Sequence, residues 1–261
     1  MHGIERAATV FLAGAECPFT CSFCDLWRWT LDGPTPPGAL PAQLRQVLDN
    51  LDNLDSLHRL KLYNASNFFD RRAVPVEDLP RIAELAAPFG AVTVESHASM
   101  VGAMALEFAG MLTGRLEVAV GLETIHPVAM QHLNKRLDLP RFDRAAAFLR
   151  EHDLDMRVFV LLGAPHVPAQ ESIEWTVKTA EYAASRGARR IAIIPVRGGN
   201  GELERLEALA TSCRQRSRSW RSHSSVAWRS HRPWSPRMSG TSPDCPLART
   251  AAPSGRRASK P

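Results

Sequence analysis

The chain has 261 residues, enough to bury a sizeable core in one large α/β domain or two small ones. It contains no run of about 18 apolar residues, which argues against a membrane span, and residues 1–6 lack the pattern of a signal peptide. Five cysteines, three of them clustered, favour reduced thiols and a cytoplasmic protein over a disulfide framework.

The formal net charge of +5 is unevenly distributed. Residues 211–261 carry 11 Lys and Arg and a single acidic residue, Asp244. Residues 1–210 therefore carry 21 basic and 26 acidic residues. The basic balance belongs to the C-terminal segment, so it is poor evidence that the rest of the chain binds nucleic acid.

Short apolar runs alternate with amphipathic runs along the first 200 residues. The apolar runs have the length and composition of buried parallel strands, and the runs between them have helical periodicity. Strands are predicted at 8–13, 59–63, 91–95, 116–121, 156–162 and 190–195, and helices at 40–54, 77–87, 101–112, 141–152 and 171–186. Six such repeats predict a parallel sheet, either an open doubly wound layer or a curved partial barrel.

The composition changes after residue 210. Residues 211–261 are rich in Arg, Ser and Pro and show no strand or helix period. We therefore predict a core domain at 4–210 and a disordered basic tail at 211–261. Two alternatives are an arginine-rich arm on RNA, with Trp220, Trp228 and Trp234 stacking on bases, and a frameshifted segment.

Three cysteines, Cys17, Cys21 and Cys24, directly follow the first predicted strand with C-x3-C-x2-C spacing. Closed zinc or electron-transfer sites normally use four protein ligands. Three thiolates instead would hold three irons of a [4Fe–4S] cluster and leave the fourth open to a cofactor. The alternative is a zinc site that a distant histidine completes.

With Phe23, the triplet reads C-x3-C-x-aromatic-C and resembles the signature of the radical S-adenosylmethionine (radical SAM) superfamily. The resemblance covers about residues 6–200. It implies a partial (β/α)6 TIM-like barrel with parallel strands and a [4Fe–4S] cluster on the three cysteines. It also implies reductive cleavage of S-adenosylmethionine to a 5′-deoxyadenosyl radical, with a flavodoxin- or ferredoxin-like one-electron reductant as partner.

The resemblance also suggests residues around S-adenosylmethionine. Phe23 would contact adenine through its backbone, and Asn64 or Ser66 would take the amino group. Glu95 and Glu123, at the ends of the third and fourth strands, are further cofactor candidates, and so is Arg157. A structural ion pair explains Arg157 equally well. No catalytic residue is assigned.

Several other stretches resemble a narrower branch of the superfamily, which includes the radical SAM subunit of archaeosine synthase and relatives of the Elongator catalytic subunit. They are residues 62–70, 94–96, 121–124, 133–135 and 160–162. This resemblance implies a tRNA nucleoside as substrate. The rival interpretations are a non-catalytic zinc or iron–sulfur module and an RNA-binding protein that uses the basic tail.

Overall fold

The computed structural model describes residues 5–198, 201 and 203–209. Internal contacts divide the chain into two units, one with the described residues up to Val196 and one with those from Arg197 onward. In the second unit, residues 203–209 are helical. The basic tail lies outside the described residues, so its disorder and its RNA contacts stay predictions.

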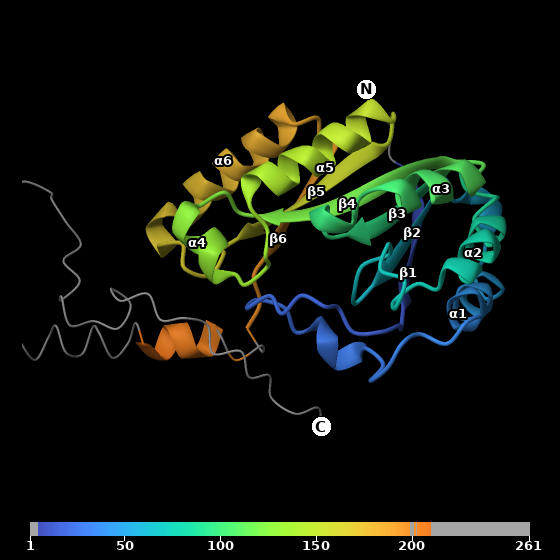
Figure 1. The fold of residues 1–261 in the computed structure, drawn as a ribbon, viewed down its shortest axis with the longest axis horizontal. Helices are drawn as coiled ribbons and strands as arrows, with labels where there is room; N and C mark the ends of the chain where they lie inside the picture. The colour runs from blue at the N-terminus through green and yellow to red at the C-terminus, as the bar shows by residue number, and fades with distance from the viewer. Residues whose placement is uncertain (1–4, 199–200, 202, 210–261) are drawn as a thin grey trace, which may run out of the picture. The chain divides into compact units, whose positions relative to one another are not determined.

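The first unit is built on one sheet of six parallel strands, which pair in their order along the chain. The sheet curves into an open half-barrel (Figure 1), which confirms the predicted partial (β/α)6 fold. The strands are β1 (Ala7–Leu12), β2 (Arg59–Asn64), β3 (Ala91–Ser96), β4 (Arg115–Glu123), β5 (Asp155–Leu162) and β6 (Arg190–Pro195).

Helices connect successive strands and pack on the outer face of the sheet (Figure 1). The α-helices are α1 (Ala39–Leu48), α2 (Leu79–Leu85), α3 (Ala103–Met111), α4 (Pro127–His132), α5 (Leu139–Glu151) and α6 (Ser172–Ser185). Short 3-10 turns are η1 (Leu26–Trp29), η2 (Leu54–Ser56), η3 (Val76–Asp78), η4 (Ala98–Met100) and η5 (Ala169–Glu171). The helix predicted at 40–54 was too long, because the chain leaves α1 after Leu48 and Asn53 has a positive φ of 58°.

The core lies between the outer face of the sheet and the helices. Alternate residues of β2 show this, since Leu60 and Leu62 are fully buried there. Their neighbours Lys61 and Tyr63 must point the other way, into the half-barrel, because successive side chains of a strand face opposite sides. The interior face of the half-barrel is therefore lined by the side chains of each strand that point away from the core.

All six strands run in the same direction, so their C-terminal ends share one edge of the half-barrel. Sites of α/β proteins collect at this edge. None of the helices in the described part of the chain has the length and hydrophobicity that a membrane crossing requires.

Candidate functional site

The three cysteines lie on the loop that leaves the C-terminal end of β1. All three are free thiols and partly buried. Burial raises the pKa of each thiol, that of Cys21 to about 12. The charge of Cys17 raises the pKa of Cys21 and Cys24 further, which shows that the thiols lie close together.

The potential metal donors on this loop are the three thiols. Within the described ranges, no three His, Cys, Asp or Glu side chains form a group that would hold one metal ion. A [4Fe–4S] cluster makes a different demand, because each thiolate binds a separate iron. Three soft thiol donors on one compact loop meet that demand.

Asn67, which follows β2, ties the cysteine loop to the end of β3. Its amide Nδ2 donates to Cys17 Sγ at 3.3 Å, and its Oδ1 accepts from the backbone N–H of His97 at 2.6 Å. The imidazole of His97 stacks on Phe19, with ring centroids 3.8 Å apart, and bonds the carbonyl oxygen of Lys135 at 2.9 Å. Burial lowers the pKa of His97 to about 4, so this imidazole is neutral at pH 7.

The loop after α4 holds the cysteine loop from the other side. The carbonyl of Leu133 accepts from the backbone N–H of Ser22 at 2.9 Å. Asn134 Nδ2 donates to both the carbonyl oxygen and the hydroxyl of Thr20, at 2.9 and 2.7 Å. Asn134 has a positive φ of 52°, a conformation that asparagine tolerates better than most residues.

A buried ion pair lies beside the cysteines. Lys135 Nζ is 2.9 Å from Glu123 Oε1, and both side chains are largely buried. Burial alone would lower the pKa of Lys135, but Glu123 and the thiols of Cys21 and Cys17 raise it above its usual value. Gly121 makes room for the pair, because a Cβ there would overlap both the carboxylate and the ammonium.

Glu123 reaches this position through an irregularity of β4. The register with β5 shifts between Gly121 and Glu123, and Glu123 has a φ of 70°. Such strain in a residue other than glycine is frequent at functional sites, where the surroundings hold it in place. The strand predicted at 116–121 ends before Glu123, whereas in the structure Glu123 is the last residue of β4.

Glu95, near the end of β3, is a neutral carboxyl at pH 7. Burial first, and then the charge of Glu123, raise its pKa to about 8. The charge of Lys135 and a hydrogen bond from the backbone of Asn64 lower the pKa of Glu95, but by less than burial and Glu123 raise it. The structure thus brings Glu95, Glu123 and the cysteine loop together at one edge, and their role around a cofactor stays a prediction.

Asn64 and Ser66 carry buried polar atoms that the protein leaves unsatisfied. Both side-chain atoms of Asn64 and the hydroxyl of Ser66 lack a hydrogen-bond partner in the described structure. Buried polar groups are nearly always paired. Such atoms are available to a polar ligand, and the role of Asn64 or Ser66 in binding the amino group of S-adenosylmethionine stays a prediction.

Phe23 lies within the cysteine loop, with Lys135 Nζ 5.9 Å from its ring centroid.

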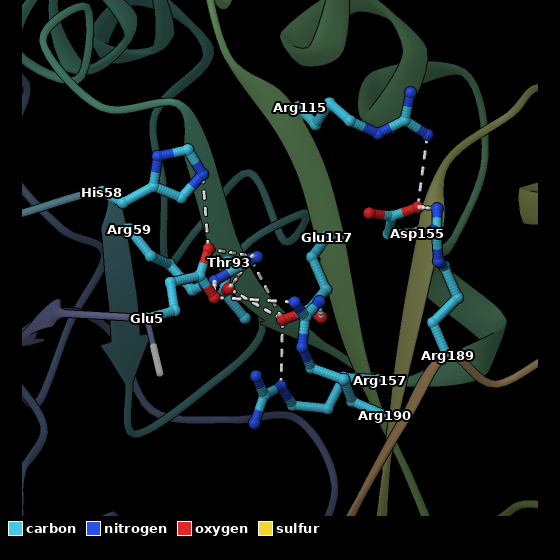
Figure 2. Close-up of polar contacts among 10 residues, drawn as sticks. All are labelled: Glu5, His58, Arg59, Thr93, Arg115, Glu117, Asp155, Arg157, Arg189 and Arg190. Atoms are coloured by element: carbon cyan, nitrogen blue, oxygen red, sulfur yellow. Dashed lines mark hydrogen bonds and ion pairs between the residues drawn. The ribbon is translucent and has the colours of Figure 1, made fainter. Parts of the chain in front are cut away.

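Arg157 lies away from the cysteine loop. It is on β5 and donates from Nε to Glu117 Oε2 at 2.9 Å, within a network of charges inside the half-barrel (Figure 2). Among the described residues, Arg157 makes no contact with the cysteine loop. A cofactor role for Arg157 remains a prediction. The observed ion pair with Glu117 is of the kind that the alternative interpretation of Arg157 expects.

No role was predicted for Asn67, and Asn134 and Lys135 entered the sequence analysis only within residues 133–135, which resemble the narrower branch. A signal existed for Asn67, because it sits in the turn after the second strand, at the edge where sites form. The contacts of Asn134 and Lys135 could not be foreseen, because they reach back more than 100 residues to Thr20 and to the neighbourhood of Cys21.

No known protein family and no curated protein matches the sequence. Solved structures do match the fold. Methylornithine synthase (PylB) has a TM-score of 0.57 at 14% identity, covering 76% of this chain and 55% of that chain. SuiB of Streptococcus suis bound to S-adenosylmethionine has a TM-score of 0.51 at 16% identity, covering 82% and 45%. The archaeal Methanocaldococcus infernus Elp3 has a TM-score of 0.54 at 14% identity, covering 79% and 50%.

The chain therefore shares a partial-barrel fold with methylornithine synthase, SuiB and Elp3. At these identities the likeness shows the fold alone. The chain spans about half the length of the solved structures it matches.

Proposed function

We propose that this chain is a radical SAM enzyme with one [4Fe–4S] cluster on Cys17, Cys21 and Cys24. One observation carries the proposal. A loop with three free thiols leaves the first strand of a partial (β/α)6 barrel, and unsatisfied buried polar atoms of Asn64 and Ser66 lie at the same edge. Three thiols leave one iron open, and the polar atoms offer partners for a cofactor at that edge.

When it is bound and reduced, the cluster supplies reductive cleavage of S-adenosylmethionine to a 5′-deoxyadenosyl radical that abstracts hydrogen from a substrate. The protein's own groups prepare the site. Lys135 lowers the pKa of all three thiols against the effect of burial, which favours the thiolates that bind iron. Asn67 donates to Cys17 Sγ and fixes its orientation.

The cofactor assignment is supported by one matching structure, that of SuiB, which is bound to S-adenosylmethionine. In this chain Asn64 and Ser66 would take the amino group, and Phe23, Glu95 and Glu123 would line the rest of the site. A flavodoxin- or ferredoxin-like protein would supply the electron. A tRNA nucleoside as substrate rests on the sequence resemblance to the archaeosine synthase and Elongator branch.

The test begins with anaerobic reconstitution of the full-length chain with iron and sulfide, followed by iron and sulfide analysis. S-adenosylmethionine and dithionite are then added, and 5′-deoxyadenosine is measured by mass spectrometry. We expect a cluster and 5′-deoxyadenosine in the wild type and neither in Cys21→Ala. Cys213→Ala is the matched control, because Cys213 lies outside the triplet and should behave like the wild type.

Zinc without sulfide in the purified protein would contradict the proposal and favour the zinc module. A full cluster in Cys21→Ala would contradict the ligand assignment. A cluster without 5′-deoxyadenosine, in the presence and absence of a tRNA pool, would favour a non-catalytic iron–sulfur module.

A further inference from the structure

A network of charges occupies the interior face of the half-barrel, in the N-terminal halves of the strands (Figure 2). Its centre is Glu117 on β4, whose side chain is 1% exposed. The Glu117 carboxylate accepts from Arg157 Nε at 2.9 Å and from Arg190 Nη1 at 2.7 Å. Arg59 binds Glu117 more weakly, at 3.5 Å, and pairs with Glu5 at 2.9 Å. Three arginines thus share two carboxylates.

Lys61 adds a fourth cation to this face. Its neighbours Leu60 and Leu62 are buried in the core, so Lys61 points into the half-barrel with Arg59. In the structure as described, the Lys61 ammonium has neither an ion-pair nor a hydrogen-bond partner. Burial, and then the charges of Arg157 and Arg59, lower its pKa. Lys61 is therefore a partly buried cation without a bonded counter-ion, whose pKa Glu117 and Glu5 raise by less than burial and the two arginines lower it.

Arg157 also has unused donors. Its Nε binds Glu117, while its two terminal amino groups have no partner among the described residues. The side chain is 15% exposed, so solvent offers these groups limited compensation. The rings of Tyr63 and Phe159, which stand two residues beyond Lys61 and Arg157 on the same strands, have centroids 6.3 Å apart, and this contact places the two cations near each other in the half-barrel. An anion between them would satisfy both and remove their repulsion.

An aromatic layer follows these two cations toward the cysteine edge. Tyr63 stands two residues beyond Lys61, and Phe159 stands two residues beyond Arg157. Their rings meet edge to face, with centroids 6.3 Å apart, and Phe11 meets Tyr63 at 6.1 Å. Phe11 is 78% exposed, so this layer presents open aromatic surface inside the half-barrel. Such surface suits the planar part of a ligand.

We propose that Lys61 and Arg157 bind the phosphate or carboxylate group of a molecule whose planar ring lies against Tyr63 and Phe159. Arg157 lies five residues before the end of β5, which corresponds to roughly 16 Å of strand. The anionic group therefore binds deep in the half-barrel, and the ring extends from it toward the cysteine loop. This site requires neither iron nor S-adenosylmethionine, so it stands apart from the proposed cluster chemistry.

The test is calorimetric titration of the full-length chain with phenyl phosphate and with benzoate at constant ionic strength. We expect saturable binding that Lys61→Met weakens roughly tenfold, equivalent to about 1.4 kcal/mol. Lys61→Arg keeps the charge and should bind within roughly threefold of the wild type, a difference of under about 1 kcal/mol. Tighter binding of phenyl phosphate would assign the site to a phosphate, and tighter binding of benzoate to a carboxylate.

The matched control is Lys178→Met, which removes the same charge from the exposed surface of α6, where Lys178 pairs with Glu174. This control also accounts for anions held by the arginine-rich residues 211–261, because both variants retain them. Equal affinities in Lys61→Met and Lys178→Met would overturn the proposal. So would the absence of saturable binding of both probes to the wild type.

Discussion

Glu117 is the residue that makes the cationic interior of the half-barrel compatible with folding. Its carboxylate accepts from Arg157, Arg190 and the hydroxyl of Thr93, and lies 3.5 Å from Arg59. Burial by itself would raise the pKa of Glu117, but Arg157 and these hydrogen bonds together lower it below its usual value. A carboxylate in such a network is ionised in the folded protein at every pH where the network is intact.

Replacing Glu117 by Gln should therefore destabilise the protein by about 3 kcal/mol at pH 7, because it leaves the largely buried Arg59 and Arg157, and the partly exposed Arg190, with one fewer counter-charge. The depressed pKa means that this stabilisation is complete above the unfolded-state pKa of about 4.3 and is lost as the pH falls through the folded-state pKa. Urea unfolding measured from pH 7 downward should show the wild type and Glu117→Gln converging below about pH 4.

The control for this series is Glu107→Gln, which changes an exposed carboxylate of α3. It should follow the wild-type stability curve within about 0.5 kcal/mol at every pH. Parallel curves for the wild type and Glu117→Gln, with no convergence in acid, would contradict the role given to Glu117.

At the scale of elements, the cysteine loop depends on a second loop that is remote in sequence. The segment after α4 supplies the carbonyl of Leu133 to Ser22 and the amide of Asn134 to Thr20. The same segment carries Lys135, which pairs with Glu123 beside the thiols. A change in this loop should therefore alter the exposure of the cysteines without touching them.

Replacing Asn134 by Ala removes both hydrogen bonds to Thr20 and should ease local opening of the cysteine loop by about 1 kcal/mol, a roughly fivefold change. The alkylation rate of Cys21 by iodoacetamide, followed by mass spectrometry in the iron-free protein, should rise by that factor. Asn53→Ala is the control, because Asn53 also has a positive φ, 58°, but precedes η2, away from this loop. Equal alkylation rates in the two variants would show that Asn134 acts only through its backbone.

The strands could be predicted closely from the sequence because each is a short run rich in apolar residues, as the strands of parallel sheets are. β4 is the clearest case, with every residue after Arg115 buried. The curvature of the sheet could not be predicted from the periodicity of the sequence, which fitted an open layer equally well. The partial barrel was predicted only from the resemblance of the cysteine motif to the radical SAM signature. The pairs Asn67–Cys17 and Glu123–Lys135 escaped prediction because each joins residues that are distant in the sequence and that only the folded sheet brings together.

At the scale of the whole molecule, the described hydrophobic core is confined to the half-barrel. Its buried members run from Ala8 to Ala183, and the last partly buried residue packed against it is Ile191. The largest fully buried side chains include Phe68, Phe89, Phe108 of α3 and Phe142 of α5, and all four belong to this core. The free energy of unfolding should therefore reside in residues that precede the second unit.

Deleting residues 211–261 should consequently change the free energy of unfolding by less than about 1 kcal/mol and leave the denaturant slope of the barrel unit nearly unchanged. Urea unfolding followed by far-ultraviolet circular dichroism compares the full chain with residues 1–210. The deletion also removes 11 basic residues and one acidic residue, so any affinity for RNA that depends on the basic tail should be lost together with its salt dependence. A large loss of stability or a broadened transition would show that this segment takes part in the fold, and would contradict the predicted division at residue 210.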